Sequence, residues 1–262
     1  MKSLNSLFNI ANFIVKSHPE LKDPLLQSLL AEEGRGLRNA RLSFDFLNQL
    51  FLKSNSQLGQ DVLALLVSGL KRNGYFVEFG AADGVLLSNT LMLEKFFGWS
   101  GILSEPAIKW HDELFKNRNC HLNTNAVWQV SGNKVTFLES KDAVYSTIKG
   151  FEDNDSHYHH RVDSQSYIVD TISLYDLLIK YNAPKVIDMI SIDTEGSEYE
   201  ILKCFDFDRF KFRFIAVEHN DTLAKQNITN LLVTNGYIPI LGELSSHDIW
   251  FCSAELESSL PF

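Results

Sequence analysis

Cysteine is scarce in this sequence. The chain of 262 residues contains three cysteines, Cys120, Cys204 and Cys252, which lie far apart and form no Cys-x-x-Cys pair. An odd and scattered set argues against a disulfide framework and against a zinc site built on cysteine ligands. We therefore expect three reduced thiols in the core, and such thiols favour a cytoplasmic location.

Long apolar runs are also missing. The longest stretches, such as Val62 to Val67, are far shorter than the roughly 20 residues that a transmembrane helix requires. Near the amino terminus, Asn5, Ser6 and Asn9 interrupt the apolar segment that a signal peptide needs. We expect neither a transmembrane helix nor secretion through a signal peptide.

Proline and glycine are few, with six and fourteen residues, whereas hydrophobic residues make up 45% of the chain. This balance is typical of a globular protein and argues against a disordered or fibrous one. Lys and Arg together number 24 against 33 Asp and Glu, so the formal net charge is −9. An acidic surface repels phosphates, so we expect no nucleic acid partner.

Residues 1–55 show the 3.6-residue periodicity of helices. Apolar residues repeat on one face from Leu4 to Ile14, and two further helices follow before residue 55. The segment contains seven basic and five acidic residues, so it is slightly positive while the remainder carries −11. We predict a helical arm, residues 1–55, that packs either on the main domain, residues 56–262, or on a second copy of the chain in a homo-oligomer.

From Gln57 onward, short apolar strands alternate with helices, which is typical of an α/β domain with a largely parallel sheet. The last two strands are close enough in sequence to form an antiparallel hairpin. The segment from Asn125 to Val186 is too long for one crossover, so we expect a β flap inserted after the third strand. The expected sheet strands are 75–79, 101–104, 121–125, 186–192, 214–218, 237–241 and 249–252, the flap strands are 134–138, 144–148 and 167–171, and the helices are 61–72, 89–97, 106–118, 174–181 and 198–205.

A turn of small residues, from Gly80 to Gly84, follows the first strand. Small residues at a strand end let a ligand approach the backbone. The turn matches neither a dinucleotide fingerprint nor a P-loop. The acids Glu78 and Asp83 would repel a pyrophosphate, but they suit a cationic cofactor such as S-adenosylmethionine. Glu105 ends the next strand, where a carboxylate can accept the two hydroxyls of a ribose.

Three segments together resemble the FkbM family of methyltransferases: Phe76 to Thr90, Ser191 to Leu202, and the upstream pairs Ser56-Gln57 and Gln60-Asp61. The resemblance implies a Rossmann-like, seven-stranded class I methyltransferase sheet, mostly parallel with an antiparallel last strand, and S-adenosylmethionine as cofactor. Within the cofactor site it implies that the glycine turn lines the methionine end, that Glu105 holds the ribose and that Asn125 flanks the adenine. The full set of expected cofactor-binding residues is Gln57, Asp61, Glu78, Gly80, Ala81, Asp83, Gly84, Ser88, Asn89, Glu105, Asn125 and Ala126.

Methyl transfer to a hydroxyl requires a group that takes the hydroxyl proton, and such a group belongs beyond the end of a central strand. Asp193 and Glu195 follow one expected strand, and Glu218 and His219 end the next. These four are the candidate catalytic residues. Either His219 or one carboxylate is the general base, or Asp193 and Glu218 hold a divalent cation that lowers the pKa of the acceptor hydroxyl. The general base is the favoured alternative, and no metal ligand is assigned.

The flap supplies further candidates. The run Tyr145-Ser146-Thr147 offers an aromatic face and hydroxyls to an acceptor, and Trp250 either does the same or packs in the core. The histidines from His157 to His160 lie in a polar stretch, where we expect a solvated loop and not a metal site. We also expect Glu198 and Glu200 to lie on the solvated face of a helix.

The sequence therefore predicts an S-adenosylmethionine-dependent O-methyltransferase. The resemblance implies that the acceptor is a sugar, a glycan or a glycosylated metabolite. Two alternatives stay open at this point. One is methylation of another small-molecule hydroxyl or of an amine, and the other is a binding module that keeps the cofactor fold without catalysis.

Overall fold

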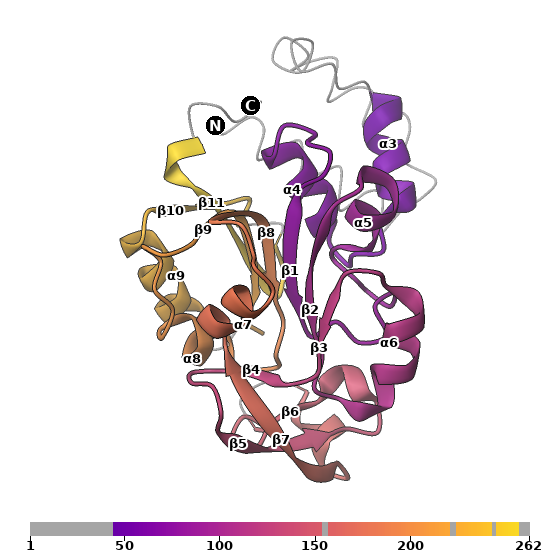
Figure 1. The fold of residues 1–262 in the computed structure, drawn as a ribbon, viewed down its shortest axis with the longest axis vertical. Helices are drawn as coiled ribbons and strands as arrows, with labels where there is room; N and C mark the ends of the chain where they lie inside the picture. Colours follow the sequence, from indigo (N-terminus) through magenta and orange to yellow (C-terminus); the bar gives the residue numbers. More distant parts are fainter. Residues whose placement is uncertain (1–43, 154–156, 221–223, 243–244, 257–262) are drawn as a thin grey trace.

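The structure, a computed structural model, describes residues 44–153, 157–220, 224–242 and 245–256. Its centre is a seven-stranded sheet with the strand order β10-β11-β9-β8-β1-β2-β3 (Figure 1). Strands β9, β8, β1, β2 and β3 run parallel, whereas β11 is antiparallel to both β9 and β10. This arrangement confirms the predicted Rossmann-like α/β sheet. The strands are β1 (Tyr75–Phe79), β2 (Ser100–Ser104), β3 (His121–Asn123), β8 (Val186–Ile192), β9 (Lys211–Glu218), β10 (Tyr237–Ile240) and β11 (Asp248–Ser253).

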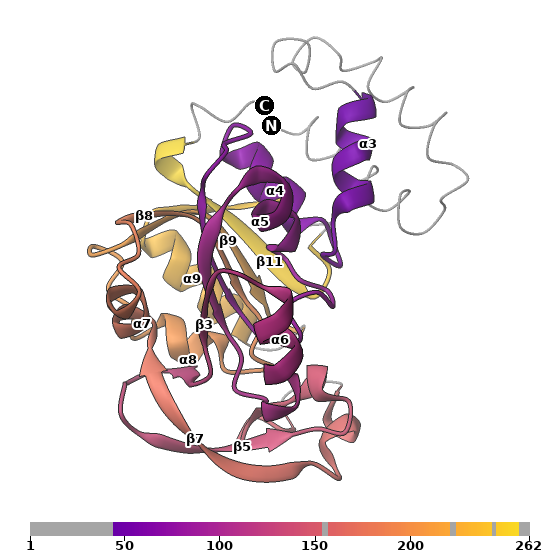
Figure 2. The same cartoon turned by 45° about the vertical axis from the view of Figure 1, so that its right-hand side comes forward.

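Helices cover both faces of this sheet, so the domain has three layers (Figure 2). Two separate apolar clusters fill the two spaces between the sheet and the helices. The helices on one face are α3 (Phe44–Lys53), α4 (Gln60–Val67), α5 (Leu91–Phe97) and α6 (His111–Asn117), and those on the other are α7 (Leu174–Lys180), α8 (Glu198–Leu202) and α9 (Ala224–Thr234).

Strand β1 shows how the sequence produces these layers. Phe76 packs in the cluster that contains α4 and α5, whereas Val77 and Phe79 pack in the cluster that contains α7, α8 and α9. Successive side chains of a strand point to opposite faces, so an apolar run without alternation is buried on both. The strand is thereby fixed at the centre of the domain, and the turn that follows it is held at the edge of the sheet.

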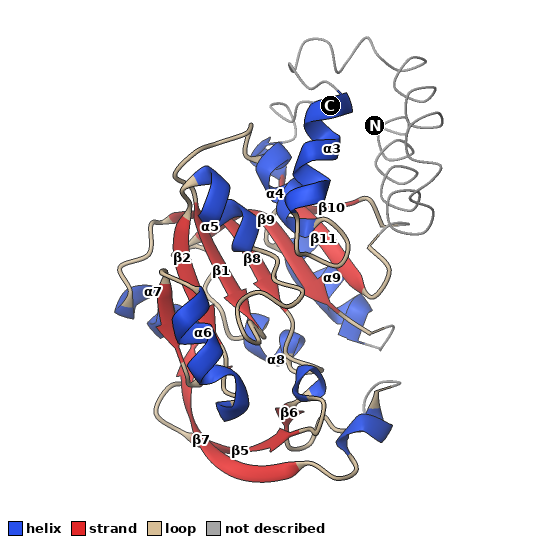
Figure 3. Ribbon diagram, turned by 90° about the vertical axis from the view of Figure 1, so that its right-hand side faces the viewer, coloured by secondary structure: helices blue, strands red, loops and turns tan. Residues whose placement is uncertain are grey.

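The predicted flap is a second, four-stranded sheet at one end of the central sheet (Figure 3). Its strand order is β4-β7-β5-β6, and its small apolar core includes Phe137, Ile148 and Val169. Strand β4, which pairs in parallel with β7, is an addition to the predicted strands. The bounds are β4 (Ala126–Trp128), β5 (Lys134–Glu139), β6 (Thr147–Ile148) and β7 (Gln165–Ser173).

Several helices are shorter than predicted. The helix expected over 61–72 ends at Val67, because Gly69 and Leu70 adopt the left-handed backbone conformation with φ of 68° and 60°. In the segment expected as one helix over 106–118, a 3-10 turn precedes α6. Helix α9 is a further addition to the predicted elements.

Most of the predicted arm lies outside the described residues. Its third predicted helix corresponds to α3, and Leu50 of this helix is buried in the same apolar cluster as α4. The first two predicted helices fall within residues 1–43, which the structure does not describe. The contact with a second copy of the chain therefore stays a prediction.

The cysteines are all free thiols, but their burial differs. Cys252 is buried, Cys120 is half-buried and Cys204 is exposed, so the expectation of three core thiols is wrong for Cys204, which lies in a surface turn after α8. Trp250 is buried in the core with 1% of its surface exposed. Among the described residues, no helix combines the length and apolar character needed to cross a membrane.

Candidate active site

A cavity of about 340 Å³ lies beyond the carboxyl ends of β1, β2, β8 and β9. Open α/β sheets bind their ligands at this edge, and the volume is within the range of small-molecule sites. Gly80, Glu105, Asp193 and Glu218 line the cavity from the strand ends, and Tyr145 lines it from the flap. The cavity therefore lies between the edge of the central sheet and the flap.

The structure brings about half of the expected cofactor-binding residues to this cavity. The members that line it are Gln57, Glu78, Gly80, Asn89, Glu105 and Ala126, and those that do not are Asp61, Ala81, Asp83, Gly84, Ser88 and Asn125. Among the candidate catalytic residues, Asp193, Glu195 and Glu218 line it and His219 does not.

Asp61 and Asp83, which do not line the cavity, stabilise the backbone around them through hydrogen bonds. Asp61 accepts hydrogen bonds from the Ser56 hydroxyl (2.8 Å) and from the backbone N–H of Val62 (2.8 Å) at the start of α4. Asp83 accepts the backbone N–H groups of Val85 (2.8 Å) and of the residue after it (2.7 Å). Such turns are a common use of aspartate. These contacts shape the cavity from outside its lining.

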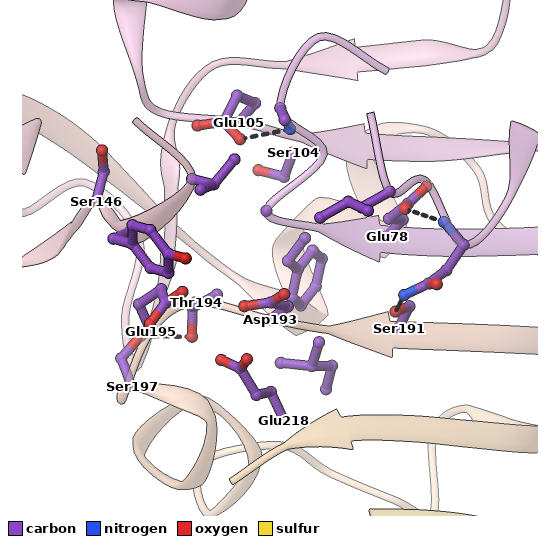
Figure 4. A pocket seen from close by; sticks show the side chains of 18 of the residues that line it. Glu78, Ser104, Glu105, Ser146, Ser191, Asp193, Thr194, Glu195, Ser197 and Glu218 are labelled. Atoms are coloured by element: carbon purple, nitrogen blue, oxygen red, sulfur yellow. Dashed lines mark hydrogen bonds between the residues drawn. The ribbon is translucent and has the colours of Figure 1, made fainter. Parts of the chain in front are cut away.

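Glu78 organises the loop that follows β1. Its buried carboxylate accepts hydrogen bonds from the Ser88 hydroxyl (3.1 Å), from the Asn89 backbone N–H (2.7 Å) and from the Thr90 hydroxyl. Figure 4 shows the carboxylate with the bond from the Asn89 backbone. Arg118 lies beside this group, with its Nη1 3.8 Å from the Glu78 carboxylate. Glu78 thus lines the cavity and also fixes the loop that closes one side of it.

Gly80 allows the ends of β1 and β8 to touch. Its φ is 71°, and a Cβ atom at this position would lie 2.0 Å from the carbonyl oxygen of Asp193. No side chain can be placed there without moving the backbone. The glycine therefore brings the turn after β1 into direct contact with the segment that carries the candidate catalytic carboxylates.

Glu105 lies at the end of β2 with both carboxylate oxygens engaged. One oxygen accepts the backbone N–H of Ala82 (2.8 Å), in the turn after β1, and the other accepts that of Ala107 (2.7 Å). Burial raises the pKa of Glu105 to about 8, and the charge of Asp193 acts in the same direction. A carboxylate oxygen can accept two hydrogen bonds, so each oxygen retains capacity for a ligand hydroxyl.

Asp193 and Glu218 form a carboxyl pair at the ends of the neighbouring strands β8 and β9 (Figure 4). Burial raises the pKa of Asp193 to about 7 and that of Glu218 well above its usual range, and the charge of Asp193 adds to the shift of Glu218. Two carboxylates in contact do not both ionise readily, so the pair holds one proton near neutral pH. The Oε2 atom of Glu218 is buried and has no hydrogen-bond partner among the described residues.

Glu195 is held by the flap. Its carboxylate accepts a hydrogen bond from Arg161 Nη2 at 2.6 Å, and its carbonyl accepts one from the Thr147 hydroxyl at 2.8 Å. Its φ is 57°, a left-handed conformation that is unusual for a residue other than glycine. Arg161 also donates to the carbonyl groups of Tyr145 (2.7 Å) and Glu152 (3.1 Å). The buried pair therefore joins the flap to the loop after β8.

His219 and Asp248 lie next to this loop. The backbone N–H of His219 donates to the carbonyl of His247 (2.8 Å), and His219 is buried but does not line the cavity. Asp248 lines the cavity and accepts hydrogen bonds from Gln60 (2.8 Å) and from Trp250 (3.1 Å). Asp248 was not among the residues predicted for the site. The signal was available, because the first residue of an antiparallel last strand lies at the same sheet edge as the last residues of its parallel neighbours.

Two expectations from the sequence are wrong. Glu198 is buried, not solvated, and its carboxylate accepts the backbone N–H groups of Thr194 (2.8 Å) and Gly196 (3.0 Å), because the loop before α8 folds over the start of the helix. His157 lines the cavity, with its Nδ1 3.7 Å from the Glu195 carboxylate, whereas His159 is exposed as expected.

Solved structures similar to this chain include methyltransferases with low sequence identity. Precorrin-6y C5,15-methyltransferase from Geobacter metallireducens GS-15 is 13% identical, with a TM-score of 0.36 over 68% of this chain and 70% of that one. The plantazolicin methyltransferase BpumL in complex with SAH is 11% identical, with a TM-score of 0.30 over 89% and 69%. A fibrillarin/Nop5p complex is 15% identical, with a TM-score of 0.38 over 75% and 79%. These distant likenesses carry no argument about the substrate.

Comparison with curated proteins finds no match. The family of the methyltransferase FkbM domain matches residues 78–246, which is more than half of the chain. This range contains the glycine turn, Glu105, the Asp193–Glu218 pair and the whole flap. The chain therefore belongs to the FkbM methyltransferase family and is an S-adenosylmethionine-dependent methyltransferase.

Proposed function

We propose that this methyltransferase transfers the methyl group of S-adenosylmethionine to a hydroxyl of a sugar, a glycan or a glycosylated metabolite. The observation that carries the proposal is the Asp193–Glu218 carboxyl pair, which faces a cavity next to the glycine turn. A hydroxyl nucleophile needs a base, whereas an amine that is already neutral does not. The family resemblance supports the sugar as the acceptor class.

The residues around the cavity suit the cofactor. We assign Gly80 to the methionine end, because a backbone without a side chain allows close approach there. We assign Glu105 to the ribose hydroxyls, because its oxygens are fixed by two backbone N–H groups and can each accept one more hydrogen bond. Ala126 is assigned to the adenine. S-adenosylmethionine, when bound, supplies an electrophilic methyl group.

Within this proposal, Asp193 is the general base. It lines the cavity, and its pKa of about 7 lies near the pH at which a base is most effective. Glu218 holds the shared proton beside it and so keeps Asp193 in place. With the cofactor bound, the acceptor oxygen would bond to the methyl carbon as the bond from that carbon to sulfur breaks, and the electron pair would stay on sulfur. Asp193 would take the hydroxyl proton, and the products would be a methyl ether and S-adenosylhomocysteine. His219, whose side chain does not line the cavity, takes no direct part.

The flap provides the acceptor side of the proposed site. Tyr145 and Ser146 line the cavity, and the Tyr145 ring stacks on His160 with 4.1 Å between the ring centroids. Aromatic faces stack on sugar rings, and hydroxyls pair with sugar hydroxyls. The hydroxyl of Thr147, which follows Ser146, already donates a hydrogen bond to the carbonyl of Glu195.

A divalent cation held by Asp193, Glu195 and Glu218 is the alternative mechanism. One oxygen from each of these carboxyl groups lies within 4.8 Å of the others. Glu195 already pairs with Arg161, which makes it a weaker ligand. Prolonged dialysis against a chelator, followed by an activity assay, distinguishes the two mechanisms. If Asp193 is the general base, the activity should not fall. If a divalent cation takes part, the activity should be lost and should return when Mg²⁺ or Mn²⁺ is added.

The test of the proposed function is a transfer assay. The protein is incubated with methyl-labelled S-adenosylmethionine and a panel of free sugars, glycosides, oligosaccharides and amines. We expect label on a sugar hydroxyl. Label confined to amines would refute the sugar acceptor, and calorimetry without binding of S-adenosylmethionine or S-adenosylhomocysteine would refute the cofactor site. A cytoplasmic location belongs to the same proposal and rests on the three free thiols.

A further inference from the structure

The ionisable side chains around the cavity are mostly acidic, although Glu105, with a pKa of about 8, and one member of the Asp193–Glu218 pair hold a proton near neutral pH. Six acidic side chains line it, and among the described lining residues there is no lysine or arginine, while two histidines are present. The acids are Glu78, Glu105, Asp193, Glu195, Glu218 and Asp248.

Most of these acids are already stabilised by the protein. Glu78 and Glu105 accept backbone N–H groups, Glu195 pairs with Arg161, and Asp248 accepts two side-chain hydrogen bonds. The Asp193–Glu218 pair has no such support from a cationic side chain. The Oε2 atom of Glu218 is buried and has no hydrogen-bond partner among the described residues.

We propose that this cavity selects against negative charge, so that the acceptor is neutral or cationic around its reacting hydroxyl and carries neither a phosphate nor a carboxylate there. This inference rests on the proposed function and narrows its acceptor class. It excludes sugar phosphates and uronic acids from the cavity. It also predicts that positive charge at the reacting position strengthens binding.

The magnitude follows from Coulomb's law. An anion about 5 Å from one carboxylate, at an effective dielectric constant of about 20, is repelled strongly enough to weaken binding about a hundredfold. Among the described residues, no lysine or arginine in the lining offsets this repulsion. A cation at the same distance gains affinity by a comparable factor, and a cation at about 10 Å gains about tenfold.

The first experiment needs no acceptor. Calorimetry compares S-adenosylhomocysteine with sinefungin, an analogue that carries an ammonium group at the position of the sulfonium. We expect sinefungin to bind about tenfold more tightly to the native protein. Because Asp193 and Glu218 share one proton, Glu218→Gln alone leaves one negative charge and preserves most of this preference. The double variant Asp193→Asn/Glu218→Gln removes the charge and should abolish the preference.

The matched control is Asp208→Asn, which removes a carboxylate whose side chain is 99% exposed and far from the lining. This variant should keep the native preference for sinefungin. Equal affinities for the two analogues in the native protein, or an unchanged preference in the double variant, would overturn the inference. Binding of S-adenosylhomocysteine by each variant shows that it is folded.

The second experiment uses labelled S-adenosylmethionine and a matched series of acceptors: a neutral hexose glycoside, the corresponding amino sugar, the uronic acid and the 6-phosphate. We expect label on the neutral and amino members and about a hundredfold less on the two anions. Anions labelled as fast as the neutral glycoside would overturn the inference. If no sugar is labelled while the analogues still differ in affinity, the sugar acceptor fails and the charge selection stands.

Discussion

The buried Arg161–Glu195 pair should be a principal attachment of the flap. The Arg161 guanidinium donates hydrogen bonds to the Glu195 carboxylate and to the carbonyl groups of Tyr145 and Glu152. Its side chain is 1% exposed and that of Glu195 is 7% exposed. Removal of one partner of a buried ion pair leaves the other charge without compensation, which costs about 3–5 kcal/mol. We therefore expect Arg161→Met to lower the free energy of unfolding by about 4 kcal/mol.

The assay is urea unfolding followed by circular dichroism, with a thermal melt in parallel. In a chain of this size each kcal/mol shifts the melting temperature by about 2–4 °C, so Arg161→Met should melt about 10 °C lower. The double variant Arg161→Met/Glu195→Gln removes both charges and should recover at least about 1.5 kcal/mol of the loss.

The flap also provides a control pair. Lys134 and Asp170 form an ion pair of 2.8 Å across β5 and β7, but their side chains are 68% and 62% exposed. An exposed pair contributes about 0–1 kcal/mol, so Lys134→Met should change little. If Arg161→Met cost no more than Lys134→Met, or if the double variant were no more stable than the single one, the reasoning from burial would be refuted.

Three further predictions concern the sheet edge. Asp193→Asn should lower kcat by about 10²–10⁴-fold with little change in S-adenosylhomocysteine affinity. The kcat of the native protein should rise as the pH passes about 7, where Asp193 loses its proton. A flat pH profile in the labelled assay would contradict this role of Asp193. Burial raises the pKa of Glu105 to about 8, so its contribution to stability is lost as pH rises through that value. Urea unfolding at pH 5 and pH 9 should therefore differ less in Glu105→Gln than in the native protein. Gly80→Ala should abolish S-adenosylhomocysteine binding, since its Cβ would lie 2.0 Å from Asp193, whereas Gly132→Ala, with no atom within 4 Å, should cost only about 1–2 kcal/mol and bind normally.

The central sheet could be predicted from the sequence because its strands are short apolar runs bounded by turns. The predicted bounds of β1 and β8 agree with the structure, since both strands are buried on the two faces and are apolar at nearly every position. Strand β4 has three residues and pairs with a strand more than forty residues later, so no local pattern marks it. Helix α4 ends because the residues after Ser68 adopt the left-handed conformation, and a leucine such as Leu70 gives no sign of that conformation in the sequence.

The location of the site could be predicted from the sequence, but the role of each residue in it could not. The acids at strand ends, Glu105, Asp193 and Glu218, could be selected because parallel strands end at one edge. The side-chain direction of Asp83 could not be predicted, because an aspartate in a turn can either hydrogen-bond the nearby backbone or face a ligand with the same sequence around it. The burial of Glu198 depends on how the preceding loop folds back, which only the tertiary structure determines.

The path of the chain into and out of the flap has a consequence for engineering. Strands β4 and β7 pair side by side, with Ala126 opposite Thr171 and Trp128 opposite Ser173, so the insertion leaves and rejoins the domain at neighbouring points. A segment with such adjacent ends can be shortened, lengthened or exchanged without rerouting the strands that it interrupts. The proposed chemistry, on the sheet edge, and the proposed acceptor contacts, on the flap, are thus carried by separable stretches of chain. Transplanting residues 129–170 between related enzymes is therefore a direct route to a new acceptor on an unchanged methyl-transfer centre.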